Sequence, residues 1–244
     1  MEEAKRDPSA LEQMRVDAYN ETVGTLSDYD CPICKNKGYV ACLKDRKMVL
    51  KICECMKRRI SMQRLEKSGL VELLKTYTMD SYKTDRPWQK TAKKKALDFV
   101  DAGKGWFVIS GTSGTGKTHL CTAICGMLLE KGYDVRYMIW REEAPKLKAS
   151  VNDRDAYERA MNELKNCGVL YIDDFWKGNV TEADINLAFE LLNARYNDRR
   201  KITIISGERS IEKILDIDQA VGSRIYELAK GNLIMTPDEN YRLR

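Results

Sequence analysis

The sequence contains no hydrophobic run that approaches the roughly 18 residues needed to span a membrane. Its first residues, MEEAKRDPSALEQ, are polar and acidic, which predicts that no signal peptide is present. Of the 244 residues, 43% are hydrophobic and 32% are charged, a balance typical of a soluble globular protein rather than a disordered chain. We therefore expect a cytoplasmic protein with no membrane partner.

A disulfide scaffold is also disfavoured, because a cytosolic chain keeps its thiols reduced. Four of the eight cysteines form two close pairs about twenty residues apart: Cys31 and Cys34 in CPIC, and Cys53 and Cys55 in CEC. Four thiolates in this arrangement are typical of a structural zinc site, which a small loop-rich module needs in order to fold. We predict that these four residues bind Zn²⁺. Unrelated free thiols, the alternative, would not explain the pairing.

The other cysteines are expected to have different roles. Residues 39–43 and 47–52 are predicted to form a hairpin between the two pairs. Cys42 lies in this hairpin, outside both pairs, and is treated as a spare thiol. Cys121, Cys125 and Cys167 occur in apolar surroundings and are expected to be small buried hydrophobic residues.

The chain is organised around residues 106–118, WFVISGTSGTGKT. Residues 106–110 suit a buried strand, and GTSGTGKT matches the phosphate-binding pattern G-x-x-x-x-G-K-[ST] without mismatch. The glycines allow a turn that points backbone N–H groups at a phosphate, and the following helix adds its positive N-terminal end. Lys117 is expected to reach the β- and γ-phosphates of ATP, and Thr118 to bind Mg²⁺. A glycine-rich turn with a chance lysine is disfavoured by the strand before it and the helix after it.

His119, the only histidine, lies in the first turn of that helix, and we expect it to be structural rather than catalytic. The expected nucleotide-binding residues are Gly111, Thr112, Ser113, Gly114, Thr115, Gly116, Lys117, Thr118, His119 and Ser206.

A second hydrolysis element follows at residues 168–174, GVLYIDD, a hydrophobic strand that ends in two carboxylates. Asp173 is expected to hold Mg²⁺ opposite Thr118, and Asp174 to orient the attacking water as general base. An Asp-Asp turn at the end of a strand is the alternative. The next predicted strand, residues 201–206, places Ser206 and Glu208 where a polar group could lie between the carboxylates and the γ-phosphate.

Three or more predicted strands separated by helices indicate a mostly parallel sheet with helices on both faces, an α/β fold. The expected domains are 1–75, a zinc-binding domain with helices; 76–87, a linker; and 88–244, the nucleotide-binding domain. Residues 35–95 hold eighteen Lys and Arg against six Asp and Glu, a charge of +12 in a chain of net charge +5. This segment either binds nucleic acid or an acidic protein surface, or it is an ordinary solvated region without a binding role.

Several of these pieces together resemble one family over nearly the whole chain. They are CPICKNKGYV, CECMKRR, GTSGTGKTHL, VLYIDDF, TIISGERS and LDIDQAVGSRIYE. They look like the bacterial and phage helicase loaders of the DnaC/DnaI type, a branch of the AAA+ ATPases, with the phage form as the nearest match. This chain departs from the family at one place. The family's third motif often carries Asn after its strand, where this chain has Ser206, Gly207 and Glu208.

The resemblance implies an ATP-dependent switch that delivers a replicative DnaB-type helicase onto single-stranded DNA in a bacterial host cell. It assigns catalytic roles to Lys117, Asp173, Asp174 and Arg224. Arg224 matches the arginine finger, which acts on ATP bound by a neighbouring subunit and so implies self-association. A salt bridge on an amphipathic helix is the alternative role for Arg224. The resemblance also implies that the zinc domain binds the helicase. Lys146 and Lys148 are candidates for DNA contact.

Two other functions remain open from the sequence. One is a transposition regulator that polymerises on duplex DNA and recruits a transposase, because that group shares the ATPase core. The other is a binding module with a degenerate ATPase site, against which the intact phosphate-binding pattern and Asp173 argue.

Overall fold

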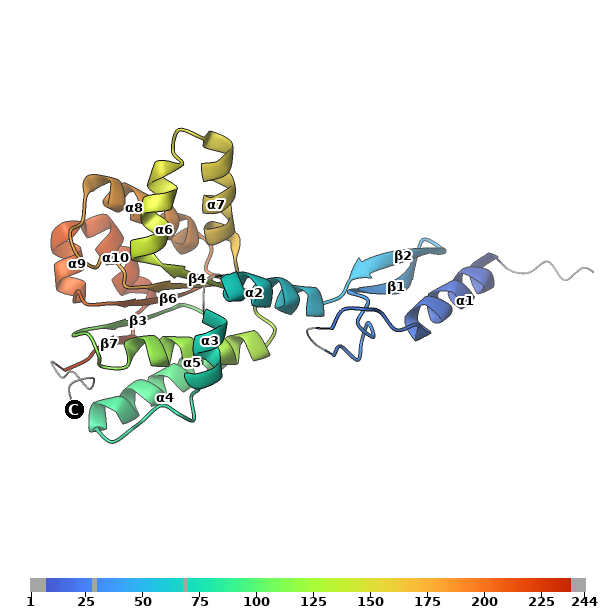
Figure 1. Cartoon of the computed structure of the whole chain (residues 1–244), viewed down its shortest axis with the longest axis horizontal. Helices are drawn as coiled ribbons and strands as arrows, with labels where there is room; N and C mark the ends of the chain where they lie inside the picture. Colours follow the sequence, from blue (N-terminus) through green and yellow to red (C-terminus); the bar gives the residue numbers. More distant parts are fainter. Residues whose placement is uncertain (1–7, 28–29, 68–69, 238–244) are drawn as a thin grey trace, which may run out of the picture. The chain divides into compact units, whose positions relative to one another are not determined.

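The computed structural model describes residues 8–27, 30–67 and 70–237 (Figure 1). The chain divides into two compact units, Met1–Ile60 and Ser61–Arg244. Among the described residues, no helix combines the length and the apolar character needed to cross a membrane.

The first unit is built around a two-stranded antiparallel hairpin of β1 (Tyr39–Lys44) and β2 (Lys47–Ile52), as predicted. Asp45 and Arg46 connect the strands with φ values of 52° and 61°, the left-handed backbone that matches the twist of a two-residue hairpin turn. The helix α1 (Pro8–Glu21) packs on the hairpin. The side-chain amide of Asn20 donates to the carbonyl oxygen of Ala41 and accepts from its N–H, both at 3.0 Å. The helix α2 (Cys55–Lys67) begins at the last paired cysteine.

The second unit contains a five-stranded sheet in the order β4-β5-β6-β3-β7, and all its described pairings are parallel. The strands are β3 (Trp106–Ser110), β4 (Val135–Ile139), β5 (Val169–Asp173), β6 (Ile202–Gly207) and β7 (Leu233–Met235). Every residue of β3, β5 and β6 is buried, as expected for parallel strands covered on both faces.

Helices cover both faces of this sheet (Figure 1). One hydrophobic core packs the sheet against α3 (Leu70–Thr76), α4 (Pro87–Ala102) and α5 (Lys117–Glu130). The other core packs it against α6 (Trp140–Ala149), α7 (Arg154–Asn166), α8 (Glu182–Asn197), α9 (Ile211–Ile217) and α10 (Gln219–Leu228). Successive residues of β3 pack alternately into the two cores. Phe107 and Ile109 belong to the first core. Trp106 and Val108 belong to the second. The predicted α/β fold is therefore confirmed.

The compact division falls at residue 60 rather than in the expected linker at 76–87. Leu65 and Leu70 are fully buried in the core around α4 and α5. Met79 and Tyr82, inside the expected linker, are also buried in that core. Residues 61–87 therefore pack as part of the unit that contains the phosphate loop.

Candidate nucleotide site and cysteine cluster

The phosphate loop connects β3 to α5 at the carboxyl end of the sheet. Gly111, Gly114 and Gly116 have φ values of 132°, 83° and 87°, which side-chain-bearing residues rarely adopt. At position 111 a Cβ would also lie 2.2 Å from Oγ1 of Thr236, so both backbone conformation and space require glycine there. Gly116 caps the start of α5, and Lys117 and Thr118 are the first residues of that helix.

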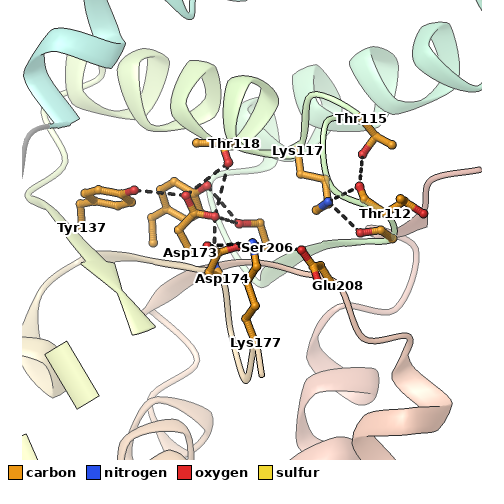
Figure 2. Close-up of polar contacts among 12 residues, drawn as sticks. Thr112, Thr115, Lys117, Thr118, Tyr137, Asp173, Asp174, Lys177, Ser206 and Glu208 are labelled. Carbon is orange, nitrogen blue, oxygen red and sulfur yellow. Dashed lines mark hydrogen bonds and ion pairs between the residues drawn. The ribbon is translucent and has the colours of Figure 1, made fainter. Parts of the chain in front are cut away.

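The Lys117 side chain is folded onto the phosphate loop (Figure 2). Its Nζ donates to the carbonyl oxygens of Gly111 at 2.7 Å and Thr112 at 2.6 Å. Burial lowers the pKa of Lys117, while the nearby carboxylates of Glu208 and Asp174 act in the opposite direction. The ammonium is thus held at the loop by weak carbonyl acceptors, which a phosphate oxygen can replace with a charge-assisted bond.

Asp173, at the end of β5, is the centre of the polar network in Figure 2. Thr118 Oγ1 lies 3.3 Å from its Oδ2, and Tyr137 donates to the same oxygen at 3.1 Å. Ser206, from β6, donates to Oδ1. The structure therefore brings Thr118, Asp173 and Ser206 together, as the sequence predicts, and adds Tyr137.

The pair Thr118 and Asp173 fits a magnesium ion. Adjacent oxygen ligands in an octahedral Mg²⁺ shell with bonds of about 2.1 Å lie about 3 Å apart. The 3.3 Å between the hydroxyl and the carboxylate oxygen is close to that spacing. Hydroxyl and carboxylate oxygens are also the donors that Mg²⁺ prefers.

Asp174 begins the turn after β5, with a left-handed φ of 54°. Its carboxylate is paired with Lys177, whose Nζ lies 3.3 Å from Oδ1. The same ammonium lies 3.0 Å from Oε1 of Glu208, which follows β6. Partial burial alone would lower the pKa of Lys177, but Glu208 and Asp174 raise it overall. The candidate general base is therefore held in an ion pair by a lysine that the sequence reasoning missed.

These side chains line a cavity of about 310 Å³. Its lining residues are Tyr77, Ser113, Gly114, Gly116, Lys117, Thr118, His119, Asp174, Lys177 and Glu208. Tyr77 comes from the expected linker, and no pattern in the sequence indicated it. Lys177 could have been found from its position four residues after Asp173, in the turn that leaves the strand.

His119 lies in the first turn of α5 and contacts the segment before α4. Its ring stacks on Tyr77 with centroids 4.7 Å apart and meets Tyr82 edge-on at 5.3 Å. Its Nε2 lies 3.0 Å from the carbonyl oxygen of Thr78 and 3.2 Å from Oγ of Ser81. His119 thus attaches residues 77–82 beside the phosphate loop while also lining the cavity.

Arg224 lies on α10 and is not among the described residues that line the cavity. Its Nε donates to Oδ1 of Asn193 at 3.0 Å, and a terminal nitrogen donates to the Ala220 carbonyl at 2.7 Å. The guanidinium lies 4.9 Å from the Phe189 ring centroid and 5.4 Å from that of Tyr196. The residue is therefore held by α8 and by its own helix, and it does not line the cavity at the phosphate loop of its own chain.

The two lysines considered for DNA contact differ in their surroundings. Lys148 pairs with Asp184 at 2.7 Å. Lys146 is 70% exposed and lies 3.5 Å from Glu143. Lys146 is thus the more accessible of the two.

In the first unit, the four paired cysteines come together in one buried cluster. Their sulfur atoms all lie within 4.8 Å of one another, with 3.8 Å between Cys31 and Cys53 and 3.5 Å between Cys34 and Cys55. Zinc–sulfur bonds of about 2.3 Å in a tetrahedron place the sulfurs about 3.8 Å apart, so the cluster fits Zn²⁺. The Gly38 N–H also donates to the Cys34 sulfur at 3.3 Å, which stabilises a thiolate.

The model of the IstB-like ATP binding protein family matches residues 37–230. The chain belongs to this family. It is accordingly an ATP-binding protein, an ATPase of the AAA+ type.

Curated relatives cover most of the chain. The phage-like element PBSX protein XkdC of Bacillus subtilis (strain 168) is 29% identical over 232 residues, which cover 89% of this chain and 86% of that protein. The replicative helicase loader DnaC of Escherichia coli (strain K12) is 25% identical over 192 residues, which cover 77% of this chain and 78% of that protein.

Solved structures agree on the fold. The crystal structure of the DnaC helicase loader has a TM-score of 0.58 at 24% identity, and the match covers 66% of this chain and 96% of that one. The replication initiator DnaA bound to AMPPCP and single-stranded DNA has a TM-score of 0.58 at 22% identity, covering 67% of this chain. The chain spans about half the length of the replication initiation structures it matches. The expected relation to DnaC and DnaI is thus confirmed at the level of family and fold.

Proposed function

We propose that this protein is an ATP-dependent loader that binds a replicative helicase of the DnaB type and delivers it onto single-stranded DNA during replication in the bacterial cytoplasm. The observation that carries the proposal is the similarity to the E. coli replicative helicase loader across more than three quarters of both chains. The proposal is supported by an assembled phosphate site in the same chain as a cysteine cluster that fits zinc.

In this proposal the first unit is the helicase-binding part. Zn²⁺ held by Cys31, Cys34, Cys53 and Cys55 would supply the folding energy that a 60-residue unit with a small hydrophobic core lacks. The basic segment of residues 35–95 would favour an acidic partner surface or nucleic acid.

The second unit is the ATPase. Lys117 would hold the β- and γ-phosphates, and Thr118 and Asp173 would hold Mg²⁺, which neutralises the developing phosphate charge. Asp174 would accept a hydrogen bond from the attacking water and orient it. Ser206 would fix the Asp173 carboxylate through the bond it donates.

Arg224 would complete the site of a neighbouring subunit. It is not among the described residues that line the cavity of its own chain, and its contacts with Asn193 and Ala220 orient the guanidinium. An arginine supplied in trans makes hydrolysis depend on assembly, since transition-state charge is stabilised only when subunits are neighbours. Head-to-tail contacts of this kind form rings or open helices.

The test is co-purification of the full chain with a DnaB-type helicase of its host, with and without ATP, followed by assay of helicase transfer to single-stranded DNA. We expect a stable complex and ATP-dependent transfer of the helicase. In Lys117→Ala, ATP should no longer stimulate this transfer. Failure to bind the helicase under either condition would overturn the proposal.

The matching family model favours a second candidate, because it is the model of IstB-like proteins. In that case the chain would regulate transposition, polymerising on duplex DNA and recruiting a transposase. Preference for duplex over single-stranded DNA, without any contact with a helicase, would support this function instead of the loader.

A further inference from the structure

The cavity beside the phosphate loop is lined by equal numbers of lysines and carboxylates. Two lysines line it, Lys117 and Lys177, together with the carboxylates of Asp174 and Glu208. The Lys117 ammonium is bound to backbone carbonyls, whereas the Lys177 ammonium bridges both carboxylates at 3.3 and 3.0 Å. Lys177 is therefore the one of these two cations that is ion-paired with the candidate general base.

The backbone that carries Lys177 is held firmly. The Phe175 N–H donates to the Ser206 carbonyl at 2.9 Å, and Arg209 donates to the Trp176 carbonyl at 2.8 Å. Both aromatic side chains before Lys177 are 1% exposed, and their rings stack at 4.8 Å. A change of partner at Lys177 therefore requires rotation of its side chain but no movement of the turn.

A terminal phosphate in this cavity would compete for the same ammonium. A phosphate oxygen carries more charge than a single carboxylate oxygen and accepts a stronger charge-assisted bond. Resting on the proposed ATPase function, we infer that Lys177 senses the γ-phosphate: it leaves Asp174 for the phosphate of ATP and returns to Asp174 when only ADP remains. Asp174 is then free to orient water only while there is a phosphate to transfer.

A purely structural ion pair is the competing explanation, and the chain contains a matched example. Lys165 pairs with Glu190 at 2.6 Å, and neither residue lines the cavity. The side chains of Lys165 and Glu190 are 22% and 41% exposed, against 27% and 38% for Lys177 and Glu208. Replacing Lys165 therefore controls for the loss of a partly exposed ion pair.

The test is equilibrium binding of AMPPCP and of ADP to the full chain with Mg²⁺, for the unchanged protein, Lys177→Met, Lys177→Arg and Lys165→Met. We expect Lys177→Met to weaken AMPPCP about tenfold while ADP changes less than about twofold. Lys177→Arg should retain most of the preference for AMPPCP, and Lys165→Met all of it. An equal AMPPCP-to-ADP ratio in all four proteins would overturn the inference.

Glu208→Gln gives an independent test should Lys177→Met fail to fold. Removal of the competing carboxylate should raise the preference for AMPPCP severalfold, and a fall in that preference would contradict the competition. A chain that discriminates between the nucleotides through Lys177 but binds no helicase would overturn the proposed loader function alone. A chain that binds neither nucleotide would overturn both.

Discussion

The hydroxyl of Tyr137 donates a 3.1 Å hydrogen bond to Oδ2 of Asp173, the same oxygen that lies 3.3 Å from Thr118. Tyr137 is in β4 and Asp173 ends β5, so the contact depends on the parallel register of these two strands. Burial, followed by the charge of Asp173, raises the pKa of Tyr137, which keeps the phenol protonated as a donor. The tyrosine thus orients the carboxylate expected to hold Mg²⁺.

Tyr137→Phe should lower the free energy of unfolding by about 1 kcal/mol, the usual contribution of one hydrogen bond. Because Asp173 would be less well oriented, the Mg²⁺ concentration for half-maximal ATPase activity should rise severalfold. Magnesium titration of ATPase activity measures this. Tyr157→Phe is the matched control, since Tyr157 donates to Glu190 at 2.6 Å outside the cavity lining. An unchanged Mg²⁺ requirement in Tyr137→Phe would contradict the role.

Asp174→Asn should reduce ATP hydrolysis at least about a hundredfold while nucleotide binding is retained, because the amide cannot act as general base. Asparagine is the suitable replacement, since it tolerates the left-handed φ of 54° that alanine would adopt only with strain. Single-turnover hydrolysis and equilibrium binding measure the two effects. Asp101→Asn, at an exposed ion pair with Lys131, should leave both unchanged. Full hydrolysis by Asp174→Asn would require another base.

Arg224→Ala should abolish most ATP turnover while leaving ATP affinity nearly unchanged, because the residue acts on a neighbouring subunit. Arg199→Ala is the control: Arg199 also lies over the Tyr196 ring, at 4.4 Å, and pairs with Glu227 at 3.0 Å. Loss of ATP binding in Arg224→Ala would instead show action within its own subunit.

Mixing inactive subunits tests the same prediction directly. Lys117→Ala retains Arg224 but cannot bind ATP productively, whereas Arg224→Ala retains the phosphate site. A mixture of the two should recover part of the activity that neither has alone, and no recovery would count against action in trans.

Cys53→Ser should remove the bound zinc, whereas Cys42→Ser should keep about one zinc per chain, because Cys42 lies outside the cluster. Elemental analysis measures the metal. Chelation should unfold the first unit while the second keeps its cooperative melting transition. A metal-free chain with a fully folded first unit would refute the zinc site.

Asp184→Asn should destabilise the second unit by about 1 kcal/mol at pH 7, after allowance for solvent screening of a partly exposed pair. Burial opposes the charge of Asp184, but the bonds from Lys148 and Thr181 lower its pKa below the usual 3.8. A lowered pKa means that the stabilisation is present above the unfolded value and is lost as pH falls through the folded one. Urea unfolding at several pH values measures the difference in free energy of unfolding between the unchanged protein and Asp184→Asn. This difference should hold from pH 7 to 5 and shrink below about pH 4. A difference that grows on acidification would contradict this sign.

The sequence was most informative where function depends on contiguous residues. The phosphate loop needs its glycines, Lys117 and Thr118 within eight positions, because one turn must point successive N–H groups at one anion. Buried parallel strands are equally local in their signal, which is why the strand ending in Asp173 could be predicted.

Contacts between distant segments were not predictable in the same way. Leu65 and Leu70 belong to the core of the ATPase unit, although their helical sequence continues from the cysteine module. Their burial depends on which neighbouring surface is available, and one sequence does not encode that surface locally.

By itself, then, the sequence determined the family and the parallel fold, and it predicted which residues bind phosphate, magnesium and zinc. Only the tertiary structure decided that Tyr137 bonds Asp173 and that Lys177 bridges Asp174 and Glu208. These contacts join side chains from different strands and turns, and they form only when strand register and turn conformation bring the carboxyl ends of the sheet together.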